Sequence, residues 1–262
     1  MSIITLTTDL GNIDHYVATI KAAIFRQLPD TNIVDISHNV PPFNIRHAAF
    51  VVKNSYQEFP QGTIHIIGVN AESDSNAPHL AVYANGHYFI GAENGMFSLI
   101  LDVKPDKIVE LNLSKDSDNQ NFPTKDVFAK AACHISRGGT LELIGKVKSN
   151  FDAQTSNLEA WFDKNVIKGG VMHIDNYGNA ITNIKQELFN RVAKERRFSI
   201  YVGNREHYTI TKIRRKYNQV ELGEAVAIFI STKLLSISIN QGSAAALMGL
   251  SLNDIIRIEF HD

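Results

Sequence analysis

Apolar positions in the first half of the chain follow two different periods. Short apolar runs at residues 3–7, 32–36 and 63–69 predict buried β-strands, and a further run at 80–83 predicts another. Elsewhere apolar residues recur every three or four positions, which predicts helices in NIDHYVATIKAAIFRQLP, PPFNIRHAAFVVKNSYQEFP and KDVFAKAACHISRG. The stretch HYFIGAENGMFSLIL indicates a strand, a turn and a short helix. Strand–helix–strand units joined by short connections predict an α/β fold with a mainly parallel sheet, covered on both faces.

The pattern changes after about residue 150. Short alternating runs separated by turn residues follow, in VIKGGVMHIDNYGNAITNI, FSIYVGNREHYTITKI, AVAIFIS and LLSISIN. Such runs are typical of β-strands. We therefore expect a second, β-rich domain, with the boundary between residues 150 and 163.

Composition narrows the classes of function. The 262 residues carry a formal net charge of -1, which gives no support to nucleic-acid or anionic-membrane binding. The single cysteine, Cys133, excludes an internal disulfide and a cysteine-based zinc site, and its apolar surroundings indicate a buried, inert thiol. The sequence shows no signal peptide and no apolar run of about 18 residues, so we expect a cytoplasmic protein. Glycine-rich phosphate motifs and histidine zinc patterns are absent, and no cofactor or metal is expected.

Candidate ligand-binding residues follow the predicted strands. In an open parallel sheet, ligands bind beyond the carboxyl ends of the strands, where TTDLGNID, SHNVPPF and NAESDSNAP lie in this chain. Asp9 ends a buried strand without a local partner, which favours ligand contact. Asp14 is expected to open the following helix, where a carboxylate also interacts with the helix dipole, so both roles stay open for it.

A second polar cluster lies in HIDNYGNAITN, where Asp175, Asn176, Asn179 and Asn183 surround Tyr177. One interpretation is a tight turn of the Asn-Gly type between two strands. The other is a nucleoside site, with the aromatic ring stacked on a base and the amides bound to its edges. The residues alone do not separate the two.

Six segments resemble one family, in order and along almost the whole chain. They are LTTDLGNIDHYVATIKAAI, NIVDISHNVPPFNIRHAAFVV, GHYFIGAENGMFSLIL, FPTKDVFAKAACHIS, HIDNYGNAITNI and SINQGSAAALMGL. They are similar to the S-adenosylmethionine (SAM) hydroxide adenosyltransferases, relatives of the fluorinase and chlorinase enzymes. The resemblance implies an N-terminal α/β domain, here 1–155, and a C-terminal β-barrel-like domain, here 164–262. It also implies a homotrimer whose ligand lies between the N-terminal domain of one subunit and the C-terminal domain of its neighbour.

The implied reaction is nucleophilic displacement at the ribose C5′ of SAM, with methionine as the leaving group and water or a halide as the nucleophile. In the N-terminal domain the resemblance implies that Asp9 binds the ribose diol and that Asp14 contacts the methionine end. Phe43 matches an aromatic residue near the sugar, and Thr124 a small hydroxyl residue near the attacking group.

In the C-terminal domain, Asp175 resembles the carboxylate that binds the methionine ammonium group. Tyr177 matches the aromatic residue that stacks on adenine, and Asn179 an amide at the adenine edge. The residues implied at the far end of the adenine pocket are Ser231, Asn240 and Gln241.

One segment departs from the hydrolase pattern. The hydrolases read V-V-D-P-G-V-G-T-x-R-R-P-I-A-V where this chain reads GVNAESDSNAPHLAV. They activate water with that aspartate, with the arginine seven residues on, and with a histidine in the later DVFA…H helix. Here Asn70 and Ala77 replace the first two, and His134 alone is left.

Three functions follow from this departure. The protein hydrolyses SAM slowly or with substitutes such as Glu72, Asp74 or His79; or it uses another nucleophile, such as a halide; or it binds an adenosyl ligand without turnover. Because the ligand-positioning residues are retained, we favour hydrolysis, with SAM as a small-molecule substrate.

Overall fold

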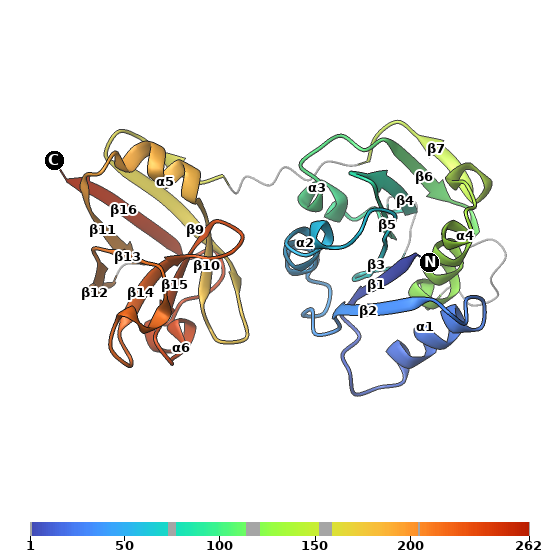
Figure 1. Cartoon of the computed structure of the whole chain (residues 1–262), viewed down its shortest axis with the longest axis horizontal. Coiled ribbons are helices and arrows are strands. Elements are labelled where there is room, and N and C mark those ends of the chain that lie inside the picture. Colours follow the sequence, from blue (N-terminus) through green and yellow to red (C-terminus); the bar gives the residue numbers. More distant parts are fainter. Residues whose placement is uncertain (1, 73–76, 114–120, 152–158, 204, 262) are drawn as a thin grey trace. The chain divides into compact units, whose positions relative to one another are not determined.

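The computed structural model describes residues 2–72, 77–113, 121–151, 159–203 and 205–261 (Figure 1). Asp74, one of the candidate substitutes, lies outside these residues. The chain divides into two compact units, 1–155 and 156–262. No helix among the described residues is long and apolar enough to cross a membrane.

The first unit contains a seven-stranded sheet in the order β2-β1-β3-β5-β4-β6-β7. The strands are β1 (Ile3–Thr8), β2 (Asn32–Ser37), β3 (Ile64–Gly68), β4 (His79–Ala84), β5 (His87–Ala92), β6 (Lys107–Leu111) and β7 (Gly145–Lys148). Strands β2, β1, β3 and β5 run parallel to one another, whereas β4, β6 and β7 join them by antiparallel pairing. The carboxyl ends of β1, β2 and β3 therefore lie at one edge, where ligands bind in such sheets.

Helices cover both faces of this sheet. They are α1 (Tyr16–Phe25), α2 (Ile45–Lys53), α3 (Met96–Ile100) and α4 (Ala129–Ser136), with short turns at Tyr56–Glu58 and Leu141–Leu143. A π-helical turn, η3 (Thr124–Phe128), leads directly into α4. Ile4 and Leu6 of β1 pack in one core with α1 and α4, while Ile67 and Val69 pack in the other with α2 and α3. Side chains alternate across the sheet, so β3 contributes Ile66 to the first core and Ile67 to the second.

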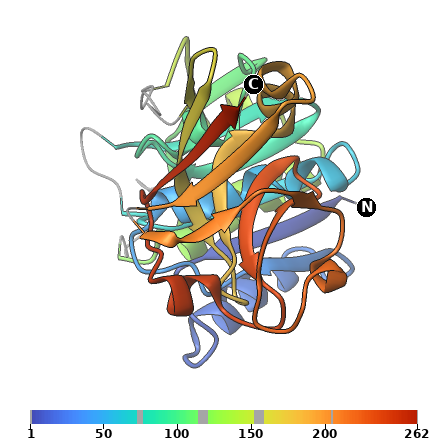
Figure 2. The ribbon, with the colours of Figure 1, turned by 90° about the vertical axis from the view of Figure 1, so that its left-hand side faces the viewer.

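The second unit is built mainly from strands, which can be followed in Figures 1 and 2. They are β8 (Trp161–Phe162), β9 (Val166–Ile174), β10 (Ala180–Lys185), β11 (Arg197–Val202), β12 (Arg205–Ile210), β13 (Ile213–Arg214), β14 (Ala225–Phe229), β15 (Leu234–Ile239) and β16 (Ile255–His261). Its helices are α5 (Gln186–Ala193) and α6 (Ala244–Met248), with a short turn at Tyr217–Gln219. The order is β12-β11-β16-β9-β10-β15-β14-β13, and β12 also contacts β14, so the sheet curls towards a barrel.

The expected fold class is confirmed: an α/β unit is followed by a barrel-like one. Strands β6 and β7 were not expected from the sequence pattern, and they extend the antiparallel part of the first sheet. Cys133 is buried in α4, and burial raises the pKa of its thiol, as expected for an inert side chain. Helix α1 begins at Tyr16, so Asp14 lies before the helix and not in its first turn, contrary to expectation.

Candidate functional site

Three loops meet around Asp9 at the carboxyl edge of the first sheet. Asp9 directly follows β1, and its Oδ2 accepts a hydrogen bond of 2.9 Å from the backbone N–H of Phe43. The N–H of Asn70, beyond the end of β3, lies 3.4 Å from the same oxygen. Among the described residues Oδ1 accepts no hydrogen bond. Asp9 is therefore fixed through one oxygen and offers the other to a ligand.

Both amide donors lie in strained backbone. Phe43 has a φ of 62° and Asn70 a φ of 46°, in the left-handed region that costs most residues about 1 kcal/mol or more. Asparagine tolerates this region better than phenylalanine does. In this conformation the backbone N–H groups of both residues point at the Asp9 carboxylate. Strained backbone of this kind concentrates at functional sites.

Phe43 presents an exposed ring next to this carboxylate. Its exposed fraction is 74%, and the following Asn44 caps α2 by accepting a hydrogen bond from His47 N–H at 3.0 Å. An exposed aromatic ring at a helix entrance suits contact with an apolar part of a ligand. Asp14 is exposed too, and no hydrogen bond links it to the Asp9 group within the described residues.

Two further side chains hold the backbone around Asn70. Asn94 Nδ2 donates to Val69 O at 3.3 Å and to Asn70 O at 3.1 Å. His79 Nε2 lies 2.9 Å from Ala71 O. A carbonyl only accepts, so this nitrogen of His79 carries the proton. Burial lowers the pKa of His79, although the bond to Ala71 O opposes the shift, so its ring is neutral at neutral pH.

Sequence reasoning missed Asn94, whose Asn-Gly dipeptide was taken only as a turn. It correctly placed His79 near the altered segment.

Thr124 lies against the same strand end. It is 2% exposed, and a Cβ on Gly68 would lie only 2.5 Å from its Oγ1, so this contact requires glycine. Gly68 is the last residue of β3, two positions before Asn70. The structure thus brings Thr124 together with Asp9, Phe43 and Asn70 at one edge of the sheet.

His134 does not join this group, which corrects the expectation that it shares a site with Asn70 and Thr124. Its Nε2 lies 2.9 Å from Thr140 O, at the end of α4. The neighbouring Ser136 Oγ is 2.5 Å from the Oγ of Ser2, just before β1 begins. Helix α4 therefore starts near the carboxyl ends of the strands and carries His134 towards their opposite ends.

In the second unit, Asp175 organises the turn between β9 and β10. Its Oδ1 accepts hydrogen bonds from the N–H groups of Tyr177 and Asn179, both at 2.9 Å. Its Oδ2 accepts from Asn179 Nδ2 at 2.9 Å. Asn179 is 6% exposed, so its amide is committed to this carboxylate. The turn expected from the sequence is present, and it holds the same carboxylate that the resemblance assigns to a ligand.

The turn presents Tyr177 to solvent, with an exposed fraction of 78%. Beside it, Gly178 has a φ of 78°, and a Cβ there would lie 2.0 Å from Ser243 Oγ. Gly178 O accepts a hydrogen bond from Ala245 N–H at 2.9 Å, which docks the turn on the start of α6. The exposed ring is therefore carried on a rigid turn.

Tyr217 is a further member of this group that the sequence did not suggest. Its phenol has a raised pKa because of burial and, to a lesser degree, the negative charge of Asp175. Sequence reasoning had no signal for it, since the two residues approach only through the fold.

The three remaining candidates separate into two groups. Asn240 and Gln241 follow β15, whose pairing with β10 brings Ile237 opposite Ala180 and thus places them near the turn. Asn240 Nδ2 donates to Val220 O at 2.9 Å. Ser231 lies in the connection between β14 and β15, at the other end of that hairpin. The structure does not bring Ser231 together with Asp175.

Each unit thus carries a carboxylate fixed by backbone amides, and one of these amides belongs to an exposed aromatic residue, Phe43 for Asp9 and Tyr177 for Asp175. Such carboxylates form charge-assisted hydrogen bonds with hydroxyl and ammonium donors. Among the described residues no group of three or more histidine, cysteine, aspartate or glutamate side chains could hold a metal ion.

Comparison with known proteins gives the same picture along the chain. An (R)-S-adenosyl-L-methionine hydrolase of Methanocaldococcus jannaschii is 30% identical over 195 residues, which cover 71% of this chain and 68% of that protein. One of Thermus thermophilus is 27% identical over 263 residues, which cover 96% and 97%. The crystal structure of an uncharacterized conserved protein from Thermotoga maritima matches with a TM-score of 0.89 and 26% identity, covering 98% of this chain and 99% of that one.

The family models agree with the division into two units. The model of the SAM hydroxide adenosyltransferase N-terminal domain matches residues 4–145, and that of the C-terminal domain matches residues 169–257. Together they span most of the chain, and the chain belongs to the SAM hydroxide adenosyltransferase family.

Proposed function

We propose that this protein hydrolyses SAM to adenosine and L-methionine. The observation that carries the proposal is the Asp9 carboxylate, held through Oδ2 by Phe43 and Asn70 with its second oxygen open to a ribose diol. Membership of the family supports it, as do two relatives named (R)-S-adenosyl-L-methionine hydrolase. The (R) epimer at sulfur is accordingly the substrate we propose.

The chemistry needs little from the protein. The oxygen of water attacks C5′ while the C5′–S bond breaks, and the bonding electron pair goes to sulfur. The sulfonium becomes the neutral thioether of methionine, and one proton of the water leaves to solvent. Because this leaving group needs no protonation, catalysis rests on holding water in line with C5′ and on excluding bulk solvent.

The proposed roles follow the two carboxylate groups. Asp9 binds the ribose diol, and the exposed ring of Phe43 packs on the sugar. In the second unit Tyr177 stacks on adenine, and Asp175 binds the ammonium group of the methionine part. Since the two groups belong to different units, we propose a homotrimer in which neighbouring subunits complete each site.

The remaining candidates have less support from geometry. Asn179, Asn240 and Gln241 lie near the Asp175 turn, which suits the adenine pocket. The roles of Asp14 at the methionine end and of Ser231 in the pocket stay predictions from the resemblance alone.

The altered segment determines the proposed rate. Asn70 holds no negative charge, and Ala77 has no cation to stabilise a hydroxide. Loss of acid–base assistance typically costs about 10²- to 10⁴-fold, so we propose turnover reduced by that order relative to a hydrolase with both groups. His79 is neutral and close to Ala71, and Glu72 is also nearby in sequence; these are the proposed substitutes.

The test is incubation with SAM separated into its two sulfonium epimers, with and without chloride or fluoride. Chromatography then measures adenosine, 5′-halogenated nucleoside and intact SAM. Adenosine released from the (R) epimer above the protein-free blank is the expected result.

Two other outcomes contradict the proposal. Halogenated nucleoside as the main product means that a halide is the nucleophile, and retention of intact SAM without product means a binding protein. The role of Asp9 in this reaction is tested with the variant Asp9→Asn, and Asp163→Asn is its matched control. Asp163 Oδ1 also accepts two backbone N–H groups, at 2.8 and 2.9 Å, but Asp163 has no proposed ligand.

A further inference from the structure

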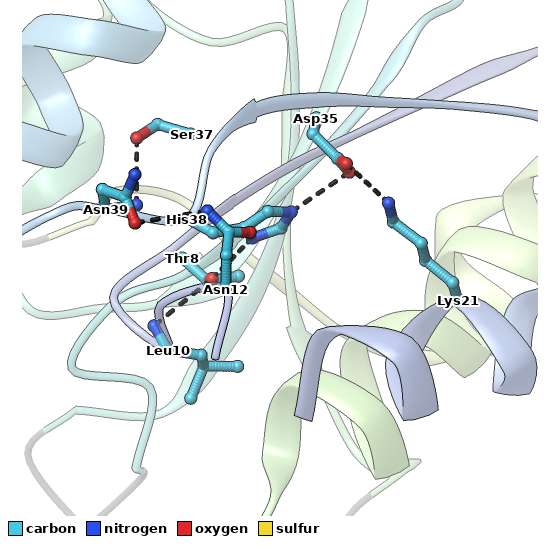
Figure 3. A network of polar contacts seen from close by, with 8 residues as sticks. All are labelled: Thr8, Leu10, Asn12, Lys21, Asp35, Ser37, His38 and Asn39. Carbon is cyan, nitrogen blue, oxygen red and sulfur yellow. Dashed lines mark hydrogen bonds and ion pairs between the residues drawn. The ribbon is translucent and has the colours of Figure 1, made fainter. Parts of the chain in front are cut away.

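A buried histidine lies behind the Asp9 turn. His38 follows β2 and is 4% exposed. Figure 3 shows its ring between two partners: Nδ1 is 2.8 Å from Thr8 Oγ1, and Nε2 is 3.1 Å from Asp35 Oδ1. Asp35 in turn accepts a bond of 2.5 Å from Nζ of Lys21, on α1. The chain of contacts leads from a lysine at the surface to the last residue of β1.

The charges in this row of contacts, from Lys21 through Asp35 and His38 to Thr8, determine how the ring of His38 is oriented. Burial alone would raise the pKa of Asp35, but the hydrogen bonds and charges of Lys21 and His38 outweigh it, and the pKa lies below its usual value. The negative charge of this carboxylate, 3.1 Å from Nε2 of His38, favours a proton on that nitrogen, and the contact is electrostatic and not an aligned hydrogen bond. On the other side of the ring, Nδ1 is 2.8 Å from the Thr8 hydroxyl, whose oxygen also accepts a hydrogen bond from Leu10 N–H at 3.4 Å. Asp35 thereby orients the imidazole towards the residue that precedes Asp9.

His38 contacts the turn a second time through its backbone. Its carbonyl accepts a hydrogen bond from Gly11 N–H at 2.8 Å, so the same residue holds the chain before and after Asp9. The two loops are joined further by Val40 N–H to Thr8 O at 3.4 Å and by Asn12 Nδ2 to Asn39 Oδ1 at 3.2 Å. Phe43, which donates to Asp9, belongs to the same loop as His38. The position of the carboxylate relative to its donor thus depends on these contacts.

We propose that His38, oriented by Asp35 and Lys21, is a positioning residue that sets the Asp9 carboxylate for the ribose diol. This inference rests on the proposed function for its ligand. Asp9 touches the sugar hydroxyls and not the reacting carbon, so loss of its positioning weakens binding in the ground state and transition state alike. The effect is a higher KM with an almost unchanged kcat.

The chain offers a matched control on the same strand. Thr5 Oγ1 is 2.8 Å from Nδ1 of His65, so β1 carries two buried threonine–histidine pairs with the same distance. The Thr5 pair lies towards the start of β1, away from Asp9. Thr5→Val and Thr8→Val remove the same hydroxyl from the same kind of contact, and only the second adjoins the site.

The experiment compares Thr8→Val, Thr8→Ser and Thr5→Val for adenosine affinity by calorimetry and for KM and kcat with SAM. We expect Thr8→Val to raise Kd and KM about tenfold, the loss of one hydrogen bond to a charged network. Thr8→Ser keeps the hydroxyl and should restore both values, while Thr5→Val leaves them unchanged. In an Asp9→Asn background, Thr8→Val should have little further effect, because the two act as a unit.

Amide hydrogen exchange tests the same inference on the protein without a ligand. Thr8→Val should speed exchange at Gly11 and Phe43 about tenfold, and Thr5→Val should not. If Thr8→Val does not fold, Asp35→Asn tests the same row of contacts on the other side of His38. The expected rise in Kd for adenosine is about threefold.

The possible results distinguish a failure of the proposed function from a failure of the positioning role of His38. A wild-type protein that binds neither adenosine nor SAM overturns the proposed function, and the exchange arm still decides the role of His38. Equal effects of Thr8→Val and Thr5→Val, or an undiminished effect of Thr8→Val without Asp9, overturn the inference.

Discussion

Asp9 and Asp175 are held in the same way by different parts of the chain. Each accepts two backbone N–H groups through one oxygen. The donors to Asp175 lie two and four residues further on, whereas those to Asp9 lie 34 and 61 residues away. The first arrangement is a local turn, and the second exists only when three strands are assembled. Damage to the fold of the first unit should therefore abolish the Asp9 site and spare the Asp175 turn.

The largest effect should come from the altered segment beside Asp9. Asn70→Asp together with Ala77→Arg should raise adenosine release about 100-fold, because acid–base assistance contributes about 10²- to 10⁴-fold. Asn70→Asp alone should do little, since a second carboxylate near Asp9 repels a forming hydroxide. Chromatography of adenosine measures all three proteins.

His134→Ala is the control for this series, because the structure places it away from the site; it should change turnover in neither background. A double variant slower than the natural protein would contradict the prediction and would point to Glu72 or His79 as the group that activates water.

Acid should destabilise the first unit at a higher pH than the second. Burial, together with the nearby His87, lowers the pKa of His65 in β3 to about 3, so its ring is neutral in the folded unit and gains a proton on unfolding below about pH 6.5. The stability that depends on this neutral ring is complete above pH 6.5. It is lost at about 1.4 kcal/mol per pH unit as the pH falls towards 3. His47, His79 and His87, all in the first unit, also have pKa values lowered by burial.

The hydrogen-exchange protection factors of β1 and β3, which correct the observed rates for the intrinsic exchange rate at each pH, should fall between pH 6 and about pH 4. The emission of the single tryptophan, Trp161 in the second unit, should change only at lower pH. His65→Gln, which does not titrate, should make the acid dependence less steep. Simultaneous loss of both signals would contradict an independent response of the two units.

Removing the Asp9 carboxylate tests the long-range site directly. Asp9→Ala should weaken adenosine binding by about 1–3 kcal/mol, as for other charge-assisted hydrogen bonds, with the first unit still folded. Titration calorimetry gives the affinity, and circular dichroism checks the fold. Unchanged affinity in a folded variant would remove Asp9 from the ribose site.

The smallest effect should come from the local turn. Asp175→Ala leaves the N–H groups of Tyr177 and Asn179 and the Asn179 side chain without their acceptor. The free energy of unfolding of the second unit should fall by about 1–2 kcal/mol. Asp163→Ala removes a similar local acceptor from an exposed turn and should cost less. Denaturation followed by Trp161 fluorescence measures both, and equal losses would mean that burial of Asn179 adds nothing.

The same contrast explains what the sequence could predict. The Asp175 turn is a local pattern, and it was visible as one. Most strand and helix periods were equally visible, but β6 and β7 were not expected, and the antiparallel direction of β4 was not visible because alternation carries no sign of strand polarity. Asp9 was found because it ends an apolar strand, while its donors from distant loops depend on the fold.

His134 shows how sequence proximity misleads. It lies ten positions after Thr124, which directly precedes the predicted helix that contains His134. At about 1.5 Å per residue, a helix moves such a residue about 15 Å along its axis. Asn94, His38 and Tyr217 were missed for the opposite reason: each is far in sequence from the residue that it holds or approaches.

The π-helical turn that carries Thr124 offers a simple way for this site to change during evolution. A π-turn accommodates one residue more than an α-turn, so it behaves as a stored insertion. Deleting one residue within 124–128 would restore α-geometry and rotate the preceding residues by about 100° around the axis. Thr124 would leave Gly68, while Ala129–Ser136 would keep their packing. A single codon lost or gained can thus re-aim this edge of the pocket without disturbing the core beneath it.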